Sequence, residues 1–288
     1  MQIRVVLVSP APISDDLVAL ASQPGEPRML GTDYGHVISV LREHDDPDTL
    51  RQQLRDTAGQ DVAVAVITGP LATSPAGLIL LDVDSTFTTT EAVDLLAEYA
   101  GAGERVAEIT ERAMRGEMDF TASLRERVAT LAGLPTSVLD EVGPRMTLAP
   151  GAEALVAAAQ AAGVRVGVTS GGFTQLVGPM AQRHGLDFSN ANELGTHVVD
   201  GVEYLTGTVV GPIVDRDQKA RDLVRFAAAH GVDPDLTVAV GDGANDLAML
   251  SAAGLGVAYC AKPLTARQAD VAITFPRLDA VAAFALLR

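Results

Sequence analysis

The sequence is poor in aromatic residues and in cysteine. It has no tryptophan, and aromatic residues make up only 4% of its 288 residues, whereas hydrophobic residues make up 48%. Alanine, valine and leucine must therefore form most of the core, which suits helices packed on a parallel sheet in one large or two modest domains. Cys260 is the single cysteine, which excludes an internal disulfide and is typical of a reducing compartment.

Basic residues are also scarce. The sequence has 21 Lys and Arg against 37 Asp and Glu, which gives a formal net charge of −16. Because no Lys/Arg cluster offsets this charge, we expect the protein to bind neither nucleic acid nor an anionic membrane surface. An anionic small-molecule substrate is compatible with the composition, provided that a metal ion or a few placed cations neutralise it locally.

Long uninterrupted apolar runs are missing as well. The uncharged residues 62–81 have the length of a membrane span, but Thr68-Gly69-Pro70 and Thr73-Ser74-Pro75 interrupt them. Two strands and a linker are the better interpretation. The apolar run at the N-terminus is too short for a signal peptide. We therefore expect a cytoplasmic protein.

Residues 1–75 have the pattern of a small α+β domain, and the Pro, Gly and Ser content of residues 69–77 marks its boundary. Residues 76–288 would form the second domain. We expect strands in the first domain at 3–8, 37–40 and 62–67, and helices at 14–21 and 47–57. This domain contains no carboxylate pair, glycine fingerprint or metal cluster, so a packing or dimerisation role is its simplest interpretation.

A helical insertion follows the strand expected at residues 78–81. Apolar side chains recur there at helical spacing in three stripes: Ala92, Leu95, Leu96 and Tyr99; Val106, Ile109, Thr110 and Ala113; and Phe120, Leu124, Val128 and Leu131. Asp119 is placed to cap the third helix at its N-terminus. We expect residues from about 88 to 148 to form an α-helical cap.

Strands and helices alternate in the rest of the chain. The expected strands are 164–169, 237–240, 255–258 and 271–274, and the expected helices are 151–162, 174–184, 217–230, 244–253 and 278–287. Period-two spacing within residues 195–211 indicates a hairpin at the sheet edge. This alternation predicts an α/β fold, with a Rossmann-like parallel sheet as its core and the helical cap inserted into it.

Polar residues stand at the ends of three of these strands. Asp82 and Asp84 directly follow the apolar residues 78–81, although Asp-x-Asp-Ser-Thr is also a common start of a turn or helix. Ser170 and Asp242 follow two further strands. Because parallel strands end at the same edge of a sheet, these side chains should converge, together with Asp246 and Lys219. Such a group offers oxygen ligands for Mg²⁺ and a cation for a phosphate.

This sequence resembles the haloacid dehalogenase superfamily of phosphotransferases in the order and spacing of four motifs: Asp82-Val83-Asp84-Ser85-Thr86, Ser170-Gly171-Gly172, Lys219 and Gly241-Asp242-Gly243-Ala244-Asn245-Asp246. The resemblance implies that Asp82 is a nucleophile and Asp84 a general acid and base. It implies a Mg²⁺ cofactor held by Asp82, Asp84 and Asp242, with Asp246 holding metal-bound water or Lys219. Ser170, Gly171, Lys219 and Asn245 would then bind the phosphate.

Within the superfamily the chain looks like a phosphoserine phosphatase, on the evidence of Glu91, residues 113–120 and residues 123–128. That resemblance implies that Glu91 receives the substrate ammonium group and Arg127 its carboxylate, while Met114 and Phe120 close over the ligand. From the residues alone, the slightly favoured interpretation of Glu91 and Arg127 is that they are charges at the rim of a packed helix face.

Three functions are compatible with these observations. The first is hydrolysis of phosphoserine, the last step of serine biosynthesis. The second is a phosphatase or phosphotransferase for another small phosphomonoester, and the third is a non-catalytic sensor of an amino acid or phosphate. Relatives often carry ACT-type regulatory domains with a βαββαβ order. Residues 1–75 show only three strands by pattern, so an ACT-like regulatory domain and a dimerisation domain, which would give a homodimer, are both retained.

Overall fold

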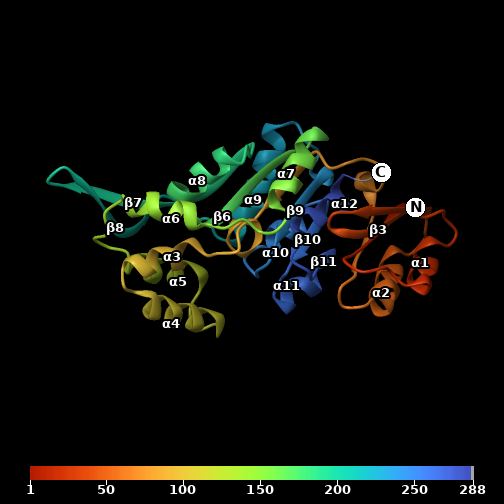
Figure 1. Ribbon diagram of the computed structural model, residues 1–288, viewed down its shortest axis with the longest axis horizontal. Helices are drawn as coiled ribbons and strands as arrows, with labels where there is room; N and C mark the ends of the chain where they lie inside the picture. The colour runs from red at the N-terminus through yellow and green to blue at the C-terminus, as the bar shows by residue number, and fades with distance from the viewer. Residues whose placement is uncertain (287–288) are drawn as a thin grey trace.

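A computed structural model describes residues 1–286, apart from the side chain of Met114. The end of the helix expected at 278–287 lies outside these residues. Two sheets organise the chain: a four-stranded sheet near the N-terminus and a seven-stranded sheet that follows it. Figure 1 shows the first at one end of the long axis, the second in the centre, and the helical cap and a projecting hairpin at the other end.

The larger sheet has the strand order β11-β10-β9-β5-β6-β7-β8. Its first six strands run parallel, and β8 is antiparallel to β7. Its strands are β5 (Leu78–Leu81), β6 (Arg165–Phe173), β7 (Phe188–Val199), β8 (Val202–Val210), β9 (Thr237–Gly241), β10 (Leu255–Tyr259) and β11 (Val271–Ile273). The parallel Rossmann-like core and the edge hairpin are therefore confirmed.

Helices cover both faces of this sheet (Figure 1). They are α7 (Ala152–Ala161), α8 (Thr174–Arg183), α9 (Arg216–Ala229), α10 (Leu247–Ala252), α11 (Pro263–Gln268) and α12 (Val281–Ala285). Leu78 and Leu80 of β5 pack with side chains of α9 and α10, whereas Ile79 and Leu81 pack with α7 and α12. This alternation along β5 is the period-two geometry of a strand buried on both sides.

Three differences from the expected elements concern the site. Strand β6, expected to end at residue 169, continues to Phe173, so Ser170 lies within the strand. The helix expected from residue 244 begins three residues later, at Leu247, because residues 243–246 form a turn. Strand β7 begins at Phe188, where the polar run Ser189-Asn190 hid it from the pattern. Asn192 in this strand is fully buried, and its amide bonds the backbone of Gly171 and Val214.

The cap contains α3 (Ala92–Tyr99), α4 (Gly103–Met114), α5 (Phe120–Ala129) and the short α6 (Val138–Val142), which the pattern had not revealed. Asp119 caps α5 as expected, since its carboxylate accepts the N–H of Ala122 at 2.7 Å. The two linkers that join the cap to the core pair with each other through a bridge between Thr88 and Leu148.

The N-terminal module contains β1 (Gln2–Ser9), α1 (Asp15–Ser22), β2 (Arg28–Thr32), β3 (Gly35–Glu43), α2 (Pro47–Thr57) and β4 (Ala63–Ile67). Its strands form an antiparallel sheet in the order β2-β3-β1-β4. The sequence pattern missed β2, a largely exposed edge strand without apolar alternation. The order of elements is therefore βαββαβ.

The two faces of the small sheet have different neighbours. Ile3, Val5 and Leu7 pack with α1 and α2, whereas Val6 and Val8 belong to the same apolar cluster as the core of the larger sheet. Arg4, which is buried, donates hydrogen bonds to the carbonyls of Leu71 and Phe284 at 2.9 Å. The module therefore rests directly on the rest of the chain. Within residues 1–286, no helix is long and apolar enough to cross a membrane.

Candidate active site

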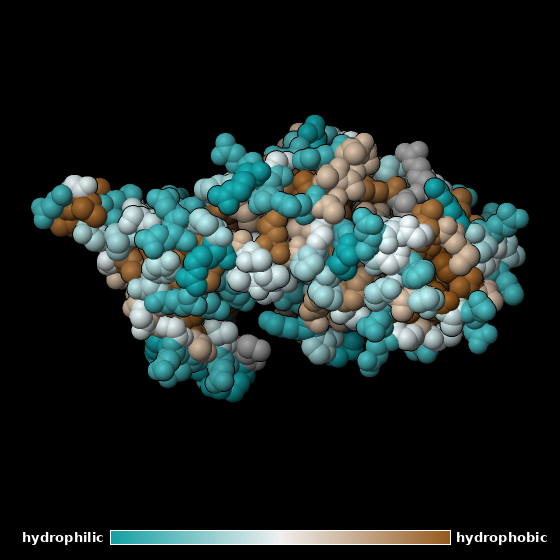
Figure 2. Space-filling view, viewed as in Figure 1, coloured by the Kyte–Doolittle hydropathy of each residue, from teal (hydrophilic) through white to brown (hydrophobic). Residues whose placement is uncertain are grey.

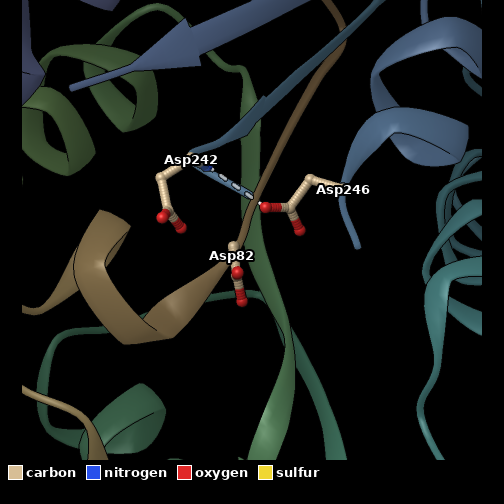
Figure 3. A group of neighbouring side chains, drawn as sticks. All are labelled: Asp82, Asp242 and Asp246. Atoms are coloured by element: carbon tan, nitrogen blue, oxygen red, sulfur yellow. Dashed lines mark hydrogen bonds between the residues drawn. The ribbon is translucent and has the colours of Figure 1, made fainter. Parts of the chain in front are cut away.

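The expected convergence of strand ends occurs in the structure. Asp82 follows β5, Asp242 follows β9, and Asp246 immediately precedes α10. Oxygen atoms of these three carboxylates lie within 4.8 Å of one another, and Figure 3 shows the side chains gathered beyond the strand ends. The register places Leu81 opposite Val168 on one side and Val240 on the other, so neighbouring parallel strands deliver the site residues together.

Lys219 lies between two of the carboxylates. Its Nζ is 2.7 Å from Oδ1 of Asp82 and 2.7 Å from Oδ1 of Asp246, and its side chain is fully buried. Burial alone would lower the pKa of Lys219, but the charges of Asp246 and Asp82 outweigh it and raise that pKa. Burial, and then the charge of Asp246, raises the pKa of Asp82, whereas Lys219 opposes the change.

Asp246 holds the turn after β9. Its Oδ2 accepts the backbone N–H groups of Asp242 at 3.1 Å and Gly243 at 2.9 Å, while Oδ1 binds Lys219. This packing requires glycine at position 241, because a Cβ there would lie 2.5 Å from Cβ of Asp246. Both oxygens of Asp246 are thus engaged in positioning its neighbours.

Asp84 lies against the start of the cap. Its Oδ1 accepts the N–H of Ala92 at 3.0 Å, and its Oδ2 accepts the hydroxyl of Ser170 at 3.2 Å. Ser170 Oγ in turn accepts the N–H of Gly172 at 2.8 Å. Burial, with a smaller contribution from the charge of Glu91, raises the pKa of Asp84 to about 6, although the Ala92 N–H opposes it. A carboxyl group with this pKa can both donate and accept a proton near neutral pH.

A cavity of about 530 Å³ opens above these residues, between the cap and the core. Arg127 and Glu91 project into it from the cap side, with Nη1 of Arg127 3.6 Å from Oε2 of Glu91. Arg127 is mostly buried, and its Nε has no hydrogen-bond partner in the described part of the chain. The ring of Phe120 packs on Gly171, where a Cβ would come within 2.9 Å of it. Glycine at 171 therefore lets the cap approach the core.

A model of the haloacid dehalogenase-like hydrolase family matches residues 79–251. The chain belongs to that family.

Curated relatives of the chain include several phosphoserine phosphatases. The chain is 51% identical to phosphoserine phosphatase SerB2 of Mycobacterium tuberculosis over 224 residues, which cover 78% of this chain and 54% of the relative. It is 50% identical to the phosphoserine phosphatase of Streptococcus thermophilus, over 70% of this chain and 92% of the relative. It thus spans about half the length of the first relative and nearly all of the second, and it falls within the phosphoserine phosphatase group of the family.

Solved structures place the chain in the same family. A haloacid dehalogenase family hydrolase from Salmonella enterica serovar Typhi superposes with a TM-score of 0.85 at 27% identity, covering 99% of this chain and 98% of the other. A substrate-bound phosphoserine phosphatase superposes with a TM-score of 0.67 at 38% identity, covering 73% of this chain and 99% of the other. The first likeness includes the N-terminal module, and the second is limited to about the length of the phosphatase core and cap.

The structure brings the residues singled out from the sequence to one place, but at two depths. Those that line the cavity are Asp82, Asp84, Glu91, Phe120, Arg127, Gly171, Asp242 and Asn245. Ser170, Lys219 and Asp246 are fully buried and lie beneath it. Met114 ends α4, and its side chain is outside the described part of the structure.

Sequence reasoning missed several lining residues, among them Val93, Thr110, Met118, Arg216 and Lys262. Two of these residues could have been predicted from the sequence. Lys262 follows β10, so the rule applied to the other parallel strands also applies to it. Arg216 lies three residues before Lys219, one helical turn earlier in α9. The apolar residues carried no signal beyond that of an ordinary helix core.

Proposed function

We propose that this protein hydrolyses O-phospho-L-serine to L-serine and phosphate through an aspartyl-phosphate intermediate, the last step of serine biosynthesis. One observation carries the proposal: Asp82 and Asp84 line the same cavity as Arg127 and Glu91. A carboxylate nucleophile and a proton donor thus face a cation and an anion that match an amino-acid head group.

Asp82 is the nucleophile. Its Oδ1 accepts the N–H of Val83 at 2.7 Å and is bound by Lys219, which fixes the carboxylate, whereas Oδ2 has no hydrogen bond within the described residues. Attack of Oδ2 on phosphorus breaks the bond from phosphorus to the seryl oxygen. Asp84 gives its proton to that leaving oxygen, so serine leaves with a neutral hydroxyl group. A water molecule then attacks the phosphoryl group, its proton passes to Asp84, and Asp82 and phosphate are released.

The residues at the strand ends fit a Mg²⁺ ion. Carboxylate oxygens of Asp82 and Asp242 are hard ligands close to one another, and the backbone carbonyl of Asp84 is the third proposed ligand. Burial, and then the charge of Asp246, raises the pKa of Asp242 to about 6 against the opposing charges of Lys262 and Lys219, so the cations present do not fully compensate this group of acids. When bound there, Mg²⁺ would neutralise charge between the nucleophile and the phosphate.

The phosphoryl oxygens would lie between the strand ends and the turn after β9. Gly171 and Asn245 line the cavity there, and Ser170 and Lys219 lie directly beneath it. We assign phosphate binding to these four residues, because hydroxyl, amide and ammonium groups are the donors that a phosphate dianion needs. Asp246 keeps Lys219 and the turn in place through its three hydrogen bonds.

The head group would lie on the cap side. The guanidinium of Arg127 can bind the substrate carboxylate with two parallel hydrogen bonds, and Glu91 can accept the ammonium group. The 3.6 Å pair between them would open to admit both groups. Phe120 closes the cavity over the serine methylene and excludes water, and we assign the same part to Met114.

The N-terminal module has the βαββαβ order of an ACT-like domain. This order and the antiparallel β2-β3-β1-β4 sheet support our proposal that residues 1–75 form an ACT-like regulatory module. One face of its sheet is already occupied by the rest of the chain, so a homodimer through this module would have to use its edges or helices.

The proposed function is tested by measuring phosphate release from a panel of phosphomonoesters with the full chain, with and without Mg²⁺. We expect phosphoserine to be preferred over phosphothreonine, sugar phosphates and nucleotides, and activity to require the metal ion. Preference for another phosphomonoester would overturn the assignment of the substrate. The absence of turnover of any phosphomonoester by folded, Mg²⁺-loaded protein would overturn the enzymatic assignment itself.

A further inference from the structure

The cavity presents an electrostatic problem for its substrate. Four carboxyl groups, those of Asp82, Asp84, Glu91 and Asp242, line it, in a chain of net charge −16. A phosphomonoester dianion that approaches such a surface is repelled over roughly a Debye length, about 8 Å at physiological salt. A Mg²⁺ ion bound at the strand ends would offset part of this charge.

The cations already described are paired. Lys219 is bound to Asp82 and Asp246 and is buried beneath the cavity, and Arg127 faces Glu91. Two further cations line the cavity, Arg216 and Lys262. Both are exposed, and among residues 1–286 neither side chain makes an ion pair or a hydrogen bond. Lys262 opposes the rise that burial causes in the pKa of Asp242, but neither cation is held by a direct contact, so both can act on a ligand.

Both residues stand on the core side, near the expected phosphate. Arg216 is the first residue of α9, one turn before Lys219. Lys262 follows β10, and its backbone N–H donates to the carbonyl of Asp242 at 3.0 Å. The chain has only two lysines, Lys219 and Lys262, and the site uses one beneath the cavity and one at its wall.

We propose that Arg216 and Lys262 are the residues that capture the phosphate dianion, attracting it into the cavity and raising its local concentration before it reaches the strand ends. The inference rests on the proposed phosphatase function but not on the identity of the head group. Charges that line the mouth of a cleft act on association and apparent affinity, and their effect falls with ionic strength.

The test uses Arg216→Gln, Lys262→Gln and the double variant, assayed with phosphoserine and with p-nitrophenyl phosphate over a range of salt concentrations. Arg267→Gln is the matched control, because Arg267 lies in α11 close to Lys262, is exposed, and does not line the cavity. We expect each site variant to lose about three- to tenfold in kcat/KM at low salt through KM, with kcat within about twofold of wild type. The double variant should show a shallower salt dependence.

The loss should be equal for both substrates, because both carry the same phosphate dianion. Lys262→Arg should restore the wild-type efficiency. Calorimetry of inorganic phosphate binding to the Mg²⁺-loaded protein gives a readout without turnover, and the affinity should fall by a similar factor in the double variant.

Several results would overturn the inference. One is a double variant with the efficiency and salt dependence of the wild type. Another is an equal loss in Arg267→Gln, which would mean that only the overall charge of the protein matters. A fall in kcat at unchanged KM would place the two residues at the reacting atoms instead. If only the head-group assignment were wrong, phosphoserine would not be preferred, but the site variants would still lose efficiency with p-nitrophenyl phosphate. The two failures can therefore be told apart.

Discussion

Lys219 joins Asp82, the proposed nucleophile, to the turn that would hold the metal ion: its Nζ is 2.7 Å from Asp82 and 2.7 Å from Asp246. Asp246 extends the connection to the N–H groups of Asp242 and Gly243. Three charges are therefore buried together, with one excess negative charge that Mg²⁺ could balance. A buried ionic group of this kind is costly to break, because removal of one partner leaves the others uncompensated.

Replacement of Lys219 by methionine should destabilise the fold. Two buried carboxylates would lose their cation, which costs on the order of 3–5 kcal/mol. Urea unfolding in the presence of a chelator measures the loss, and the deficit should shrink at pH values where the carboxylates take up protons. Lys262→Met is the control, since the side chain of Lys262 is exposed and unpaired. Equal stability of Lys219→Met and wild type would contradict the described network.

Replacement of Asp242 by asparagine should stabilise the metal-free protein at high pH. The pKa of Asp242 is raised to about 6 from an ordinary 3.8, so the folded state holds its proton more tightly than the unfolded state. Its contribution to stability is complete below pH 3.8 and is lost as pH rises through 6. A shift of this size corresponds to about 1–3 kcal/mol after allowance for partial exposure.

Melting curves with chelator at pH 4 and pH 8 test this expectation for Asp242. Asp242→Asn should melt higher than wild type at pH 8 and nearly the same at pH 4. Added Mg²⁺ should raise the melting temperature of wild type at pH 8 much more than that of the variant. A Mg²⁺ response that is unchanged in the variant would remove Asp242 from the proposed ligands.

Replacement of Asp82 by asparagine should abolish turnover without loss of fold. The amide keeps the shape of the side chain but cannot form the aspartyl phosphate. Phosphate release is measured on freshly purified protein checked by mass spectrometry for deamidation. Activity within tenfold of wild type would be incompatible with the covalent route.

The site was predictable from the sequence because it depends on a simple geometric rule. Asp82 and Asp242 follow parallel strands and Ser170 lies near the end of a third, and such ends share an edge wherever the sheet is parallel. The depth of each side chain was not predictable. Ser170 and Lys219 lie beneath the cavity because Asp84 and Asp246 bind them there, and these contacts join residues far apart in the chain.

Other elements were missed for separate physical reasons. Strand β2 is held by pairing with β3 at an exposed edge, so burial left no alternating pattern in its sequence. Strand β7 contains polar residues whose partners are distant: Asn190 binds Asp222, and Asn192 binds Gly171. A polar run reads as a loop unless those partners are known.

Replacement of Arg127 by alanine should separate recognition of the head group from chemistry. If Arg127 binds the substrate carboxylate, its removal leaves that charge desolvated, at a cost on the order of 3–5 kcal/mol. This is about two to four decades of kcat/KM at ~1.4 kcal/mol per decade. Hydrolysis of phosphoserine should fall by this amount, whereas p-nitrophenyl phosphate, which has neither carboxylate nor ammonium, should be hydrolysed nearly as before. Glu91→Gln should show the same selectivity through the ammonium group.

The matched control for Arg127 is Arg105→Ala, since Arg105 is also a cap arginine paired with a glutamate, at 3.1 Å from Glu108, but does not line the cavity. It should leave both substrates unaffected, and melting curves confirm folding of each variant. Equal losses on the two substrates in Arg127→Ala would mean that the residue supports the cap rather than the substrate. Small losses on both would make Arg127 and Glu91 rim charges. Because the wall charges Arg216 and Lys262 should affect both substrates alike, only a loss confined to phosphoserine identifies the head-group site.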